Sequence, residues 1–166
     1  MSQESCMQVQ PQAEHKWLQK LVGQWSFEGE CVMGPDQPAT KHRGSETVRS
    51  VGGLWTLGEG RGAGPDGSEM TSYMTLGYNP STNRFVGTFI ASMMTHLWIY
   101  NGTLDAAGKV LTLDTEGPDF SGGPAMAKYQ DIIELVSDDH RILKSRLRGA
   151  DGNWIDFMTA HYRRKK

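Results

Sequence analysis

Hydrophobic and polar residues follow two different periods along the chain, one before and one after Trp25. The apolar positions between residues 17 and 22 recur at helical spacing behind Pro11, and Gly23 ends this pattern. From Trp25 onward the period becomes two, which is typical of β-strands. The pattern therefore predicts one short amphipathic helix followed by a β-fold.

Turn signals divide the rest of the chain at nearly regular intervals. They predict ten strands at 24–33, 40–50, 54–63, 68–78, 84–92, 96–104, 109–116, 126–136, 140–149 and 153–163. Most connections are short and carry hairpin chemistry, as in Asp151-Gly152, so consecutive strands are expected to be neighbours in a meander. The longer stretch 117–124, which contains Phe120, is the one connection expected to serve as a mobile lid.

A ten-stranded meander leaves two unpaired edges, and closure into a barrel removes them. We therefore expect an all-β, up-and-down antiparallel barrel of the lipocalin-like kind, as one domain over 11–166 behind a disordered leader at 1–10. A sandwich is the alternative. The interior of such a barrel is either filled by side chains or holds one small ligand. The pattern leaves the inward face open, because Phe85 and Phe89 alternate with the equally apolar Val86 and Ile90.

Composition narrows the classes of partner. The 20 glycines favour many short elements joined by turns, and the net charge of −2 gives no field that would attract nucleic acid or an anionic membrane. We read the basic run 163–166 as a solvated chain end. Cys6 and Cys31 could pair only by tying the leader to the first strand, and residues 1–10 lack the apolar core of a secretory signal. A reducing, cytoplasmic setting is therefore expected.

Three short motifs carry a resemblance to known proteins. Gly23-Gln24-Trp25, directly after the predicted helix, resembles the Gly-x-Trp entry to the first strand of lipocalins and related calycins. Together with Gly52-Gly53-Leu54 and Leu76-Gly77-Tyr78-Asn79 it is similar to the bacterial lipocalin-like family DUF1579 over nearly the whole chain. The resemblance implies a barrel with a cavity, and the family brings no established activity or ligand.

The resemblance also implies how the barrel closes. In lipocalins a basic side chain on the last strand packs across the Gly-x-Trp tryptophan, and antiparallel pairing of the last strand with the first would bring Arg163 or Arg164 beside Trp25. Haem-binding nitrobindin-like relatives carry alternating glycines after the tryptophan, whereas this chain has Ser26-Phe27-Glu28-Gly29-Glu30-Cys31. No haem or other cofactor is therefore expected.

Aromatic and histidine residues on two predicted strands supply the candidate ligand-binding site. His96 alternates with Trp98 and Tyr100, and His161 lies on the last strand, so these four residues are expected to line the barrel if their faces point inward. We expect them to bind a small, largely hydrophobic molecule. One alternative is a barrel enzyme that uses His96 or His161 as a general base. A second alternative is a module with a packed interior that forms a homodimer.

Other patterns are given structural readings. The glycines at 58, 60 and 62 do not form a dinucleotide fingerprint, because Pro65-Asp66-Gly67 turns the chain into another strand. They leave one strand face bare, which suits a barrel bend or the close approach of a ligand. The five histidines lack metal-ligand spacing, so no metal is expected. Asp156 shares a face with Met158 and is expected to be buried with a partner or to lie at the barrel mouth.

Overall fold

Ten antiparallel strands follow one another along the chain. The structure is a computed structural model and describes residues 9–64 and 66–166; Cys6 and most of the predicted leader lie outside these residues. Its elements are helix α1 (Ala13–Gln19) and strands β1 (Gly23–Cys31), β2 (Thr40–Val51), β3 (Trp55–Ala63), β4 (Glu69–Asn79), β5 (Arg84–Ala91), β6 (Trp98–Leu104), β7 (Val110–Pro118), β8 (Met126–Ser137), β9 (His140–Arg148) and β10 (Trp154–Arg164).

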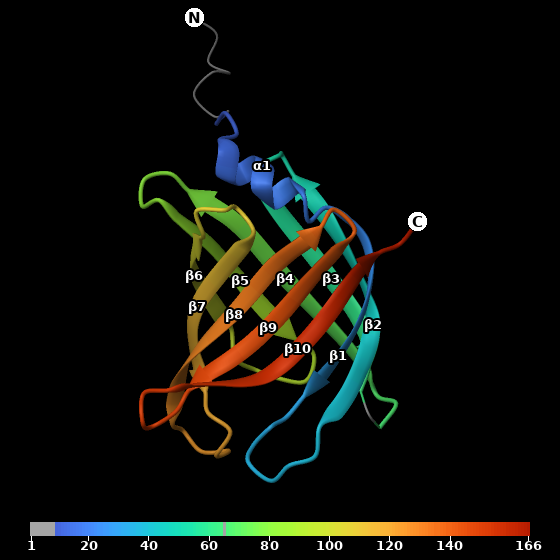
Figure 1. Cartoon of the computed structure of the whole chain (residues 1–166), viewed down its shortest axis with the longest axis vertical. Helices are drawn as coiled ribbons and strands as arrows, with labels where there is room; N and C mark the ends of the chain where they lie inside the picture. Colours follow the sequence, from blue (N-terminus) through green and yellow to red (C-terminus); the bar gives the residue numbers. More distant parts are fainter. Residues whose placement is uncertain (1–8, 65) are drawn as a thin grey trace, which may run out of the picture.

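Each strand pairs with its sequence neighbours, and β1 also pairs with β10, so the sheet closes into a barrel (Figure 1). The prediction of an up-and-down antiparallel barrel is confirmed, and the sandwich alternative is wrong. Every strand begins within two residues of its predicted start. Turn chemistry located the strands well because each reversal of a meander needs residues that adopt turn conformations.

The two ends of the barrel differ. Helix α1 lies across one end, where β2, β4, β6 and β8 are joined to their successors by short turns (Figure 1). Longer connections lie at the opposite end, including 32–39, 92–97 and 119–125. The fold therefore gives the barrel one covered end and one end framed by longer loops.

Hydrogen bonds and apolar packing fasten α1 over the covered end. The indole of Trp17 donates from Nε1 to the carbonyl of Gly108 at 2.7 Å. His15 accepts from the backbone of Gln12 through Nδ1, which leaves Nε2 to donate to the carbonyl of Tyr78 at 3.0 Å. Trp17 and His15 are both buried. The amphipathic helix predicted from the sequence is thus a lid that is bonded to the turns beneath it.

Helix α1 has seven residues. Within 9–64 and 66–166, no helix has the length and apolar character that a membrane-spanning helix needs.

Candidate functional site: the barrel lumen

The strand register decides which side chains point into the barrel. Trp25 pairs with Glu46 on β2, and Glu46 with Gly60 on β3, and the buried residues of every strand fall on this same face. We call the space enclosed by these inward-facing residues the lumen. Gly58, Gly60 and Gly62 all face it. In the closed order of strands β3 lies across from β8, so the bare wall of β3 faces the inward side chains of β8.

Packing of the lumen changes from the covered end to the open end. Beneath α1 the inward side chains are fully buried, as shown by Trp25, Leu76 and Leu111. Farther from the helix, inward side chains remain partly accessible to water although strands surround them. These partly accessible residues include Phe27, His42, Met74, Phe89, Asp131, Leu143 and Met158. The lumen is therefore packed at one end and incompletely filled toward the other.

A carboxyl group lies in the middle of the lumen. Asp131 on β8 accepts a hydrogen bond at Oδ1 from the hydroxyl of Ser145, at 2.6 Å, and another at Oδ2 from the hydroxyl of Tyr100. Tyr100 and Ser145 are buried. Burial raises the pKa of the Asp131 carboxyl above its ordinary value, and the two hydrogen bonds offset only part of that effect. Burial and the nearby carboxyl together raise the pKa of Tyr100 well above its usual range.

A second polar cluster lies at the floor of the lumen, beneath α1. Arg141 on β9 forms an ion pair with Glu46, and its guanidinium lies 4.6 Å from the centre of the Trp25 ring and 4.1 Å from that of Tyr162. Burial and the carboxylate of Glu46 raise the pKa of the Tyr162 hydroxyl. The hydroxyl of Thr115 and Nε of Arg141 are buried with no hydrogen-bond partner among the described residues. Such groups are normally paired, so they mark places where a water or a ligand would be stabilised.

Aromatic side chains surround the open end. Trp98 and Tyr129 pack edge to face with ring centres 5.0 Å apart. Phe120, from the connection 119–125, packs against Phe157 at 5.1 Å, and Phe157 packs against Tyr129 at 5.9 Å. The hydroxyl of Tyr129 donates to the carbonyl of Pro118, which ties the start of this connection to the barrel wall. The loop predicted as a lid therefore places an aromatic ring over the mouth.

The structure brings three of the four predicted ligand-binding residues to one side of the barrel. Trp98 and Tyr100 face the lumen, and His96 packs its ring against Trp98 at 4.8 Å. His96 lies before β6 rather than within it, because β6 begins at Trp98, and its Nε2 is 2.8 Å from the carbonyl oxygen of Glu116. His96 is thus a residue of the rim.

His161 does not join them. Its neighbours Ala160 and Tyr162 are buried in the lumen, so the alternation of β10 turns His161 outward, where its Nδ1 lies 3.0 Å from Nε2 of His140. Burial lowers the pKa of His140, as does the positive charge of Arg163. The two candidate general bases therefore lie apart: His96 is at the rim, and His161 is outside the barrel.

Of the two residues predicted to close the barrel, Arg164 lies over Trp25. Its guanidinium is 4.2 Å from the centre of the ring. It also donates to the carbonyls of Val22 and Lys20, at 2.7 and 3.0 Å. Arg163 is exposed because it has the opposite parity on β10. Sequence reasoning missed Arg141, whose guanidinium also lies over the ring of Trp25. Its parity on β9 is that of Leu143 and Ser145 and opposite to that of the other basic residues of the strand, so alternation was the signal that could have found it.

A bulge changes the position of Asp156. The pairing of β10 with β9 shifts between Asp156 and Met158, so Asp156 pairs with Arg146 and is exposed, while Met158 keeps its place in the lumen. The predicted sharing of a face with Met158, and with it the burial of Asp156, is therefore wrong; Asp156 lies near the start of β10, at the open end. One extra residue reverses the parity of everything before it on the strand.

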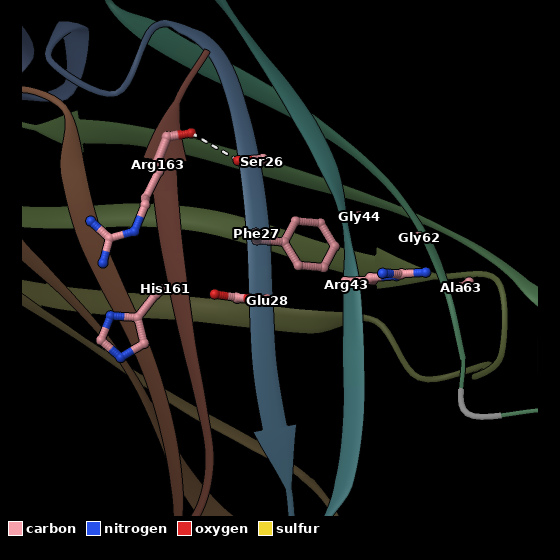
Figure 2. A pocket seen from close by; sticks show the side chains of 9 residues that line it. All are labelled: Ser26, Phe27, Glu28, Arg43, Gly44, Gly62, Ala63, His161 and Arg163. Atoms are coloured by element: carbon pink, nitrogen blue, oxygen red, sulfur yellow. Dashed lines mark hydrogen bonds between the residues drawn. The ribbon is translucent and has the colours of Figure 1, made fainter.

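Two shallow grooves lie outside the lumen. One, of about 530 Å³, crosses β10, β1, β2 and β3 and is lined by outward-facing side chains together with Phe27, Gly44 and Gly62; Figure 2 shows His161 and Arg163 on one side of β1 and Arg43 on the other. The second, of about 710 Å³, crosses β6 to β10 and includes His96 and Trp154. Both are open surfaces of mixed charge. Among residues 9–64 and 66–166 no group of three or more histidine, cysteine or acidic side chains is arranged to hold a metal.

The model of the family described as "Protein of unknown function (DUF1579)" matches residues 10–164. The chain belongs to DUF1579. The resemblance inferred from its short motifs is thus confirmed, and this DUF1579 protein has the barrel that the resemblance implied. No curated protein matches the chain in sequence.

Solved structures place this DUF1579 protein among β-barrels of low sequence identity. Rv2717c from M. tuberculosis is 14% identical, with a TM-score of 0.65 over 95% of this chain and 100% of its own. The S-type phycobiliprotein lyase CPES from Guillardia theta is 12% identical, with a TM-score of 0.64 over 93% of this chain and 94% of its own. A de novo designed fluorescence-activating β-barrel is 13% identical, with a TM-score of 0.50 over 90% and 98% of the two chains. At these identities the similarity establishes the fold.

Proposed function

We propose that this protein binds a small molecule with a largely apolar body inside the lumen, and that the ligand enters at the end opposite α1. One observation carries the proposal: enclosed, inward-facing side chains such as Phe89, Leu143 and Met158 retain accessible surface, whereas the side chains beneath α1 do not. An interior packed only for stability would have buried these apolar groups against one another.

The arrangement of the lining supports an oriented ligand. Aromatic rings at the mouth, among them Trp98 and Tyr129, offer apolar surface to the body of the molecule. Deeper in the lumen, Asp131, Tyr100 and Ser145 offer polar atoms to its head. A few polar groups set into an apolar wall are typical of small-molecule sites, since they fix the orientation of the ligand. His96 belongs to this proposal as a residue of the rim, and His161 does not.

The test uses the uncharged fluorescent probe N-phenyl-1-naphthylamine, which brightens in apolar surroundings. Leu143→Trp enlarges a side chain inside the lumen, and Ile142→Trp makes a matched change on the outer face of the same strand. We expect the protein to bind the probe, Leu143→Trp to weaken binding at least ~10-fold, and Ile142→Trp to leave it unchanged.

Circular dichroism and urea unfolding of both variants provide the folding control. Equal binding by all three proteins would place the probe outside the lumen and contradict the proposal, as would absence of probe binding by the unchanged protein.

A further inference from the structure

The acidic side chains that face the lumen are more accessible to water than the arginine beside them. Two carboxyl groups, Glu46 and Asp131, keep part of their surface accessible, with 14% of the Glu46 side chain exposed. The one inward-facing arginine beside them, Arg141, is only 6% exposed. His42 on β2 also faces the lumen, and burial lowers the pKa of its imidazole, which favours the uncharged form at pH 7.5. A ligand that enters from the mouth therefore meets acidic oxygens before it meets a cationic side chain.

The positive charge of Arg141 is already used. Its guanidinium pairs with Glu46 and lies over the rings of Trp25 and Tyr162. An anionic ligand would have to replace Glu46 as the partner of Arg141 and leave that carboxylate unpaired, which is costly in a buried site.

Asp131 has hydrogen-bond donors but no cationic partner among the residues that the structure describes. Tyr100 from β6 and Ser145 from β9 donate to it, β7 contributes Leu113 and Thr115, and the Arg141–Glu46 pair and Tyr162 lie deeper, from β9, β2 and β10. An ionised carboxylate has about four acceptor positions, so two donors leave it unsaturated. Burial raises the pKa of this carboxyl because its charge lacks compensation, and a bound cation would supply that compensation.

We propose that the lumen selects a small organic amine, with its apolar body against the aromatic mouth and its ammonium group against Asp131, and discriminates against carboxylates. The inference rests on the proposed function, since it assigns a chemical class to the ligand of the same lumen. It follows from one uncompensated carboxyl opposite the glycine wall of β3, together with an inward-facing arginine, Arg141, that is already paired with Glu46.

Three ligands of matched size test the charge preference by displacing N-phenyl-1-naphthylamine at pH 7.5: cationic 1-naphthylmethylamine, uncharged 1-naphthylmethanol and anionic 1-naphthoate. We expect the amine to bind at least ~10-fold more tightly than the alcohol, and the carboxylate to bind most weakly; tenfold corresponds to about 1.4 kcal/mol. Equal affinities, or tighter binding of the carboxylate, would overturn the proposal.

Asp131→Asn tests the assigned residue. It should remove the preference for the amine over the alcohol, because the charge that the ammonium group pairs with is lost. Persistence of the preference in a folded Asn variant would overturn the assignment. If the Asn variant does not fold, pH replaces it: as pH is lowered from 7.5 the amine stays cationic while Asp131, whose pKa is raised by burial, takes up a proton, so amine affinity should fall and alcohol affinity should not. A pH-independent ratio would also overturn the proposal.

The two proposals fail in different ways. In one case Leu143→Trp loses probe binding, and the three ligands displace the probe from the unchanged protein equally well. The lumen is then a binding site, but it has no charge preference. Probe binding that is unaffected by Leu143→Trp removes the proposed function itself.

Discussion

At the residue scale, closure of the barrel depends on Trp25 and the basic side chains around it. Arg164 and Arg141 cover its ring, and its own Nε1 donates to the carbonyl of Leu21 at 2.9 Å. The contact with the last strand was predictable, because the Gly-x-Trp entry fixes Trp25 and antiparallel pairing fixes its neighbours. The choice between Arg163 and Arg164 was not, because it depends on a one-residue register that turn positions do not set.

Replacing Arg164 with alanine should destabilise the fold by about 2 kcal/mol or more, because the cation–π contact and the bonds to the carbonyls of Val22 and Lys20 are lost together. Arg163→Ala is the matched control and should stay within about 0.5 kcal/mol of the unchanged protein. Urea unfolding measures both. Equal effects of the two substitutions would contradict the assignment of Arg164 to closure.

Asp131 makes stability depend on pH in a defined direction. Its pKa in the folded protein is raised above that of the unfolded chain, so its contribution to stability is fully present below the unfolded pKa and is lost as pH rises through the folded pKa. The free energy of unfolding of the protein minus that of Asp131→Asn should therefore fall as pH rises above about 4, the ordinary pKa of an aspartate. A difference that rises with pH would mean that the Asp131 carboxylate is stabilised in the lumen, contrary to this expectation.

At the element scale, the sequence located the strands but did not choose their inner faces. On β5 the inward residues are Phe85, Gly87, Phe89 and Ala91, and the outward set is equally apolar. The choice follows from closure with the neighbouring strands. Asp131 was not a candidate for the same reason: a carboxyl flanked by Gln130 and Ile132 reads as outward-facing until the register of β8 with β7 and β9 turns it inward. The bulge in β10 could not be predicted from the sequence either, because the inserted residue is not of a type that marks a bulge.

Several strand glycines lie directly across from an aromatic residue, which gives these glycines a structural purpose. Phe27 lies over Gly44, Trp55 over Gly77 and Trp98 over Gly117. In each pair a Cβ on the glycine would collide with the ring. A large ring can thus lie flat on the neighbouring strand, and this pairing fixes register. The sequence predicted that the glycines of β3 leave one face of that strand without side chains. Part of this face is covered by an aromatic ring, since Phe27 also reaches Gly62.

Gly44→Ala should destabilise the barrel by about 1–3 kcal/mol, because the new Cβ would meet the carbonyl oxygen of Arg61 and the ring of Phe27, and the backbone has no room to yield. Gly123→Ala, where the nearest atom is Ser121 Oγ at 3.7 Å, is the control and should be nearly neutral. Thermal unfolding followed by circular dichroism compares the two. A neutral Gly44→Ala would contradict the close packing of β1, β2 and β3.

The connection 119–125 should control access to the lumen. Phe120→Ala removes the ring that packs on Phe157 and Tyr129, so association and dissociation of N-phenyl-1-naphthylamine should both become several-fold faster while affinity changes little. Stopped-flow fluorescence gives both rates. Met126→Ala, at an exposed position just after the same connection, is the control, and equal rates in both variants would remove the role of Phe120 as a cover.

At the scale of the whole molecule, the side chains that line the barrel interior change in character along its axis. Helix α1 covers one end (Figure 1), where the Arg141–Glu46 pair fills the interior. Asp131 and its hydroxyl partners occupy the middle, and aromatic rings frame the other end. The sequence predicted the barrel, the helix and two of the lining residues, Trp98 and Tyr100, because these follow from local patterns. The polar interior follows only from closure of the sheet, which brings together residues from β2, β6, β8 and β9.

A crystal structure of the protein with 6-bromo-2-naphthol tests the central claim most directly, because the anomalous signal of bromine locates the molecule independently of the fit of its ring. We predict a single bromine peak inside the barrel, near Phe89, Leu143 or Met158. A bromine peak confined to the outer grooves, with the inward side chains packed against one another, would contradict the claim that the lumen binds a ligand.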